Sequence, residues 1–146
     1  MKTILLATFC FSTTFNVLHG QSRCDTTRMD MIFTITEVMP KSNITLDELE
    51  TKINQEINAS DFPMPQGNMI YLTFTINCKG ETFDFKFLRP VDEKLQDKIL
   101  AIVKTNMNWQ AGSQNGRVVD VQTTISIKIE NNKFNIQNKK TSKKGK

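Results

Sequence analysis

The sequence predicts one α+β domain, in which a small three-stranded antiparallel sheet packs with two helices. Three observations indicate this fold class. Two neighbouring segments alternate apolar and polar residues on either side of a glycine-containing bend, two others carry apolar residues at helical spacing, and a long alternating segment follows near the C-terminus. About 100 residues form this body, which is enough for one small core and not for two.

The segment from Met69 to Leu88 is predicted to be a β-hairpin. Its first half has an apolar residue at every second position, and its second half does the same with phenylalanines. Gly80 lies in the bend between the halves and supplies the positive φ that such bends need. The apolar rows that predict one buried face are Ile70, Leu72, Phe74 and Ile76, followed by Phe83, Phe85 and Phe87.

Two segments, 45–58 and 92–105, are predicted to be helices. The first opens with Thr45 and Glu48, which have the spacing of a capping box. The second opens just after Pro90, because proline is tolerated at a helix start. Their apolar stripes, expected to cover the hairpin, are Leu46, Leu49, Ile53 and Ile57 in the first helix and Leu95, Ile99, Ile102 and Val103 in the second.

A final strand is predicted from Arg117 to Ile129. Such a strand is too long for a short hairpin to pair along its whole length, so part of one edge is expected to stay free. That part accepts a segment of another protein, a second copy of the chain, or an additional N-terminal strand at Ile32–Thr36. The candidate partner-binding residues are Arg117, Val118, Val119, Asp120, Val121, Gln122, Thr123, Thr124, Ile125, Ser126, Ile127, Lys128 and Ile129.

The two ends of the chain are predicted to lie outside the domain, which is placed at residues 23–134. Residues 1–22 have the pattern of a cleaved signal peptide, with Lys2 before an apolar run too short to span a bilayer. The protein is therefore expected in the periplasm or outside the cell. Residues 135–146 form a lysine-rich tail, expected to be disordered. That tail accounts for the net charge of +4, so a basic nucleic-acid-binding face on the domain is not supported.

Cleavage of the predicted leader would change which reactive side chains the mature protein contains. Cys10 and His19, the single histidine, leave with it, and Cys24 and Cys78 stay. In an oxidising compartment these two cysteines form a disulfide or remain as two thiols. Without histidine the mature chain has no nucleophile–histidine pair and no zinc site. The sequence therefore predicts a protein that is not an enzyme and binds no metal, cofactor or small-molecule substrate.

The segment from Trp109 to Val119 resembles a family signature. In the C-terminal domain of TonB, the energy-transducing protein of gram-negative bacteria, the same place has roughly the pattern Trp-x-Pro-Gly-x-x-Asn-Gly-x-x-Val. The matching residues are Trp109, Gly112, Asn115, Gly116 and Val119, and Ala111 replaces the usual proline. From the residues alone, Trp109 is expected at the rim of the core and Asn115–Gly116 at a chain reversal.

Further segments match the family in the same order. Glu37–Pro40, Phe62–Pro63 and Lys79–Gly80 resemble its Glu-x-Met-Pro element, its Tyr-Pro pair and its hairpin bend, so the resemblance covers about residues 31–130. The four prolines are scattered, and a proline-rich spacer like that of a full-length energy transducer is not expected.

The resemblance implies a periplasmic adaptor related to TonB-dependent transport. In the family, the last strand takes up an extended segment of an outer-membrane receptor by β-strand addition. This points to an envelope protein as the partner of Arg117–Ile129. The alternative is a structural or self-associating periplasmic domain without a transport role, in which the same edge is used internally or joins two copies in a homodimer.

Overall fold

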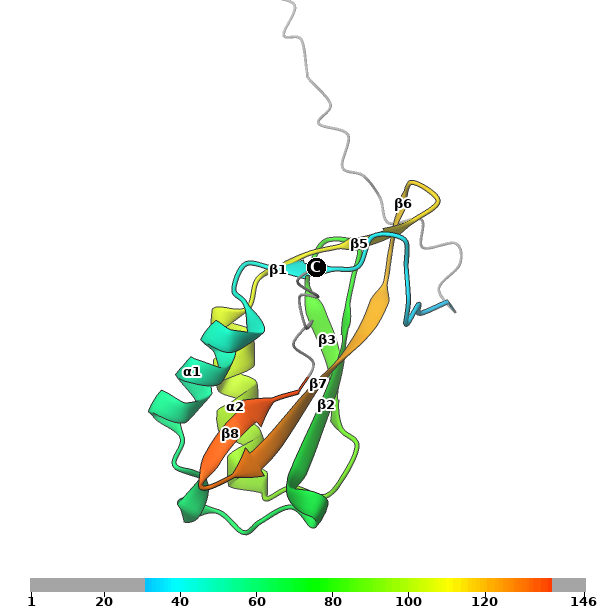
Figure 1. Ribbon diagram of the computed structural model, residues 1–146. Coiled ribbons are helices and arrows are strands. Elements are labelled where there is room, and N and C mark those ends of the chain that lie inside the picture. Colours follow the sequence, from blue (N-terminus) through cyan, green and yellow to red (C-terminus); the bar gives the residue numbers. More distant parts are fainter. Residues whose placement is uncertain (1–30, 138–146) are drawn as a thin grey trace, which may run out of the picture.

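The computed structural model describes residues 31–137, whose main feature is a four-stranded antiparallel sheet with the strand order β3-β2-β7-β8 (Figure 1). Two helices pack on one face of this sheet. The predicted leader and most of the predicted tail lie outside the described residues. The strands are β1 (Lys41–Ser42), β2 (Met69–Ile76), β3 (Thr82–Phe87), β4 (Trp109–Gln110), β5 (Gly112–Gln114), β6 (Arg117–Val119), β7 (Val121–Glu130) and β8 (Lys133–Ile136), and the helices are α1 (Leu46–Glu56) and α2 (Glu93–Asn106), with short 3-10 turns at Ala59–Asp61 and Gln66–Asn68.

The core lies between the helices and one face of the sheet, which confirms the mixed α+β class. β2 and β7 pair in antiparallel register, with Leu72 opposite Ile125 and Ile70 opposite Ile127. Because side chains alternate between the two faces of a strand, this register gathers the apolar rows of both strands on one face. Fully buried side chains of the core include Ile70, Leu72, Phe74, Ile76, Leu49, Ile53, Leu95, Ile99, Ile127 and Phe134.

Both predicted helices form, with slightly different ends. Thr45 caps α1: its hydroxyl accepts the Glu48 N–H at 3.1 Å, and its own N–H donates to the Glu48 carboxylate at 2.7 Å. These hydrogen bonds from Thr45 hold the pKa of Glu48 below its usual value. Asp92 caps α2 by accepting the Leu95 N–H at 3.2 Å, so that helix begins at Glu93.

The predicted three-stranded sheet is wrong by one strand, because the chain turns back after β7. Asn131 and Asn132 both have positive φ, 50° and 57°, which is the conformation of a tight two-residue hairpin turn. β8 therefore pairs with the end of β7 and buries Phe134 and Ile136. The domain extends past its predicted boundary at residue 134.

The predicted final strand and the predicted N-terminal strand also need correction. Arg117–Ile129 is not one strand: β6 pairs with β5 in a two-stranded ribbon, and β7 pairs with β2. Ile32–Thr36 forms no strand, and only Phe33 makes an isolated parallel bridge, to Val121. A second ribbon joins β1 to β4.

The hairpin bend packs directly against the chain at Trp109. An ideal Cβ on Gly80 would lie 2.1 Å from the Trp109 carbonyl oxygen, so only glycine fits this approach. The Trp109 ring is half-buried and lies 5.7 Å from the Phe74 ring between centroids. Trp109 therefore closes the end of the core, where its position at the rim was expected.

Replacing Gly80 with alanine should destabilise the domain much more than replacing Gly116 with alanine. Both glycines have positive φ, +82° and +71°, but an added Cβ at Gly116 would have nothing within 4 Å. Gly116→Ala should therefore lose about 1–2 kcal/mol of unfolding free energy, and Gly80→Ala at least about 3 kcal/mol, since backbone must move. Urea unfolding measures both, and equal losses would contradict the steric role of Gly80.

Candidate functional site

The candidate partner-binding residues lie on β6, on β7 and at the junction between these strands. Here the outer edge means the side of this chain segment that faces away from β2 and β5. Along its other side, β7 pairs with β2 from Val121 to Lys128. The outer edge is also occupied at its C-terminal end, because β8 pairs with Ile127–Glu130 and the Gln137 N–H donates to the Ser126 carbonyl at 2.8 Å. The prediction of a free edge is therefore wrong for this end of the strand.

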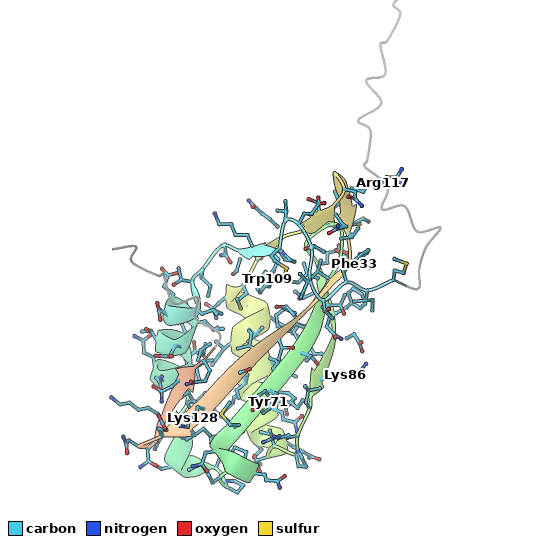
Figure 2. All side chains as sticks on the ribbon, turned by 45° about the vertical axis from the view of Figure 1, so that its right-hand side comes forward. Phe33, Tyr71, Lys86, Trp109, Arg117 and Lys128 are labelled. Carbon is cyan, nitrogen blue, oxygen red and sulfur yellow. The ribbon has the colours of Figure 1, made fainter. Side chains whose placement is uncertain are left out.

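The N-terminal end of β7 carries a different occupant on its outer edge. The Phe33 N–H donates to the Asp120 carbonyl at 3.0 Å, and the Gln122 N–H donates to the Phe33 carbonyl at 2.8 Å. These two bonds have the pattern of parallel strand pairing, but only one residue, Phe33, takes part. Figure 2 places Phe33 beside the end of β7 that lies near Arg117, while Lys128 marks the opposite end. Residues 31–36 are called the N-terminal strap below.

The strap has a second and stronger attachment directly after it. Val38 and Ser113 exchange two main-chain hydrogen bonds, at 3.1 and 2.9 Å. The Glu37 N–H donates to the side-chain oxygen of Gln114 at 3.0 Å, and the Glu37 carboxylate accepts the Asn115 N–H at 3.0 Å. The chain is therefore held firmly to the β5–β6 hairpin at 37–38, whereas β7 is contacted through Phe33.

Asp120 joins three parts of the chain at this point. Its carbonyl accepts from Phe33 in the strap, and its carboxylate accepts the Cys78 N–H at 3.0 Å, just beyond the end of β2. Cys78 is itself disulfide-bonded. The predicted partner, Cys24, lies outside the described residues, so the Cys24–Cys78 pairing stays a prediction.

On β6 the outer edge is open among residues 31–137. Val118 lies opposite Ser113, whose N–H and carbonyl are both bonded to Val38. The Val118–Ser113 pair is therefore a non-hydrogen-bonded pair, and the N–H and carbonyl of Val118 point away from β5. The Val118 side chain is also exposed. The Val118 N–H and carbonyl are thus available on the same outer edge, just N-terminal to the groups that bond to Phe33.

The two outermost strands of the sheet are protected in other ways. On β8, Asn54 of α1 accepts the Phe134 N–H at 2.9 Å and donates to its carbonyl at 2.8 Å, and Glu50 accepts the Ile136 N–H at 2.7 Å. On β3, the register with β2 shifts between Phe83 and Lys86, where Asp84 has a positive φ, and Lys86 pairs with Asp84 at 2.9 Å. Helix cover, bulges and charges are devices that keep edges from pairing with other chains.

Three residues of the predicted turn signature lie at or beside the β5–β6 hairpin to which Glu37 and Val38 are attached. Asn115 and Gly116 have positive φ, 50° and 71°, and turn the chain from β5 into β6, as expected for a chain reversal. At Gly112 an added Cβ would lie 2.9 Å from both the Val121 side chain and the Val38 carbonyl. Gly112 therefore allows the chain at Val38, β5 and the start of β7 to approach closely, a role that the sequence did not reveal.

Metal groups, membrane-spanning helices and similar proteins are the remaining points. Between residues 31 and 137 there is no group of three or more His, Cys, Asp or Glu side chains that could hold a metal ion. In the same range no helix has the length and apolar character needed to cross a bilayer. No protein-family model, curated protein sequence or solved structure compared with the chain matches it.

The disulfide prediction can be tested directly on the purified mature protein. A non-reduced proteolytic digest should yield a Cys24 peptide joined to a Cys78 peptide, and reduction should separate them. Cys24→Ser should then lower the free energy of unfolding by about 4 kcal/mol, because the bond closes a long loop of the unfolded chain. A free Cys24 thiol in the unreduced protein, detected by alkylation, would contradict the pairing.

Proposed function

We propose that this protein is an exported adaptor that takes up an extended segment of an envelope protein by β-strand addition, in a role related to TonB-dependent transport. The observation that carries the proposal is Phe33, which bonds to the outer edge of β7 through main-chain hydrogen bonds to Asp120 and Gln122. A single residue, Phe33, already bonds to this edge as a residue of an added strand would. Main-chain pairing needs only exposed amides and carbonyls, so a partner segment can use the same groups.

Most of the exposed apolar side chains belong to segments next to the proposed binding edge. Among residues 31–137, nine large hydrophobic side chains are exposed. Six of them belong to the strap, to the residues just after it or to β6, and these are Met31, Ile32, Ile35, Val38, Met39 and Val118. Apolar side chains gathered at one place on a surface mark interaction sites more often than scattered ones do.

The proposed site is narrower than the predicted one. It consists of the outer edge from Val118 to Gln122, because β8 occupies the edge from Ile127 onward. The partner is proposed to be an envelope protein, such as an outer-membrane receptor with an extended periplasmic segment. Export by the predicted leader and the absence of catalytic activity belong to the same proposal.

One observation favours the alternative, a structural or self-associating domain. Both occupants of the outer edge, β8 and Phe33, come from the same chain. If this cover is permanent, the long strand serves the internal architecture and needs no partner. The two functions differ in whether the edge at Val118–Gln122 accepts a peptide in solution.

Peptide binding at this edge should depend on the Val118 amide. A synthetic peptide copied from the extended periplasmic segment of an outer-membrane receptor should shift the amide NMR signals of Val118 and Gln122. Val118→Pro removes the outward N–H and should weaken binding about five- to tenfold, the effect of one net hydrogen bond. Val118→Ala keeps the N–H and serves as the control.

The same titration separates the two functions. If millimolar receptor peptide leaves every amide from Val118 to Gln122 unshifted, the adaptor function fails and the structural alternative stands. Equal weakening by Val118→Pro and Val118→Ala would assign the binding to the side chain and not to strand addition.

A further inference from the structure

We infer that the N-terminal strap, residues 31–36, is an internal competitor for the strand-addition edge, so that a partner segment binds only when Phe33 withdraws from β7. This inference rests on the proposed function and adds its regulation. It also states the chemistry of the segment that fits the edge.

The competition follows from shared atoms. The Asp120 carbonyl accepts the Phe33 N–H at 3.0 Å, and the Gln122 N–H donates to the Phe33 carbonyl at 2.8 Å. A strand added along Val118–Gln122 needs the same carbonyl and the same N–H, since it must bond to consecutive outward-facing groups of the edge. The Gln122 N–H cannot serve both strands at full strength. Partner and strap are therefore mutually exclusive at this point.

The strap can separate from β7 while the chain behind it stays attached to the domain. Ile32 and Ile35 are 47% and 81% exposed, whereas Thr36 at the end of the strap is buried and donates its hydroxyl proton to the Val38 carbonyl at 2.9 Å. Directly behind the strap, Glu37 and Val38 stay attached to the β5–β6 hairpin through their own hydrogen bonds. A segment with few buried contacts beside a firm anchor opens at much lower free energy than the core does. The exposed stretch of residues 34–35 can act as the hinge.

The direction and the side chains of the strap indicate which kind of segment could replace it. Phe33 pairs with Val121 in parallel orientation, so the competing segment runs in the same direction as β7. It has an aromatic or aliphatic side chain at the place of Phe33, which is half-buried, and no proline there, because its N–H must reach Asp120. The occupant is thus an extended, apolar peptide segment of an exported protein with a sequence pattern like Ile-Phe-Thr.

A peptide copy of residues 31–37 is the defined probe for this competition. It is added to the full mature protein and to two variants, Phe33→Pro, which lacks the N–H that bonds to Asp120, and Ile35→Ala, a matched control at the exposed neighbour. Phe33→Pro should accelerate amide hydrogen exchange at Gln122 and bind the peptide about tenfold more tightly than the wild type, because a larger share of molecules has an open edge. Ile35→Ala should match the wild type in both measurements.

The outcomes separate the inference from the function on which it rests. If the Phe33→Pro edge exchanges faster but wild type and variant bind the peptide equally, the strap does not compete and the inference fails while strand addition stands. If Gln122 exchange rises and neither protein binds the probe or a receptor peptide, the proposed function fails as well. A third measurement needs no variant: saturating peptide must abolish the nuclear Overhauser contact between Phe33 and Gln122 in the wild type. A contact that persists with peptide bound overturns the competition.

Discussion

The pairing of β2 with β7 is the interaction on which the rest of the structure depends. Its register runs without interruption from Met69 opposite Lys128 to Ile76 opposite Val121. A shift of one residue would turn every apolar side chain of β7 away from the helices, so the burial of both rows fixes the register. The same pairing uses only one side of β7. The other side of a long central strand must then be covered by something else, and this requirement shapes the candidate site.

Elements that depend on neighbouring residues could be predicted from the sequence, and elements that depend on distant contacts could not. The capping box of Thr45 and Glu48, the apolar stripe of α2 and the hairpin around Gly80 all follow from local spacing, and each is present in the structure. The sequence does not predict β8, although Asn131–Asn132 is a recognisable turn pair, because the alternating segment after it is short and ends in polar residues. Its edge is closed by Asn54 and Glu50 from a helix far away in the sequence, which local patterns do not reveal.

The candidate site was predictable in outline and not in detail. The sequence predicted Arg117–Ile129 as one strand with a free edge, and it did not indicate that the chain divides into β6 and β7 or that Phe33 and β8 share the outer edge. The Asp120 junction links a carbonyl, a carboxylate and the disulfide-bonded Cys78, and no spacing in the sequence indicates it. The glycines of the turn signature have steric reasons of their own: Gly112 lies against Val38 and Val121, and Gly80 against Trp109. The resemblance to the TonB C-terminal domain therefore stays a proposal, because these residues would be needed for the architecture with or without a partner.

The contrast between the covered edges argues that they serve different purposes. β8 is joined to β7 over four residues, buries Phe134 and Ile136, and has its own outer groups bonded to α1, so its removal would open the core. Phe33 is a single bridging residue between exposed neighbours, and its withdrawal would leave the core intact. Permanent cover at Asp120–Gln122 would be expected to take the form of a full strand, like β8 at the other end of β7. Under the proposed function, cover by a single residue would protect the edge against unspecific pairing and would leave it accessible to a partner segment that also pairs with the open groups of Val118.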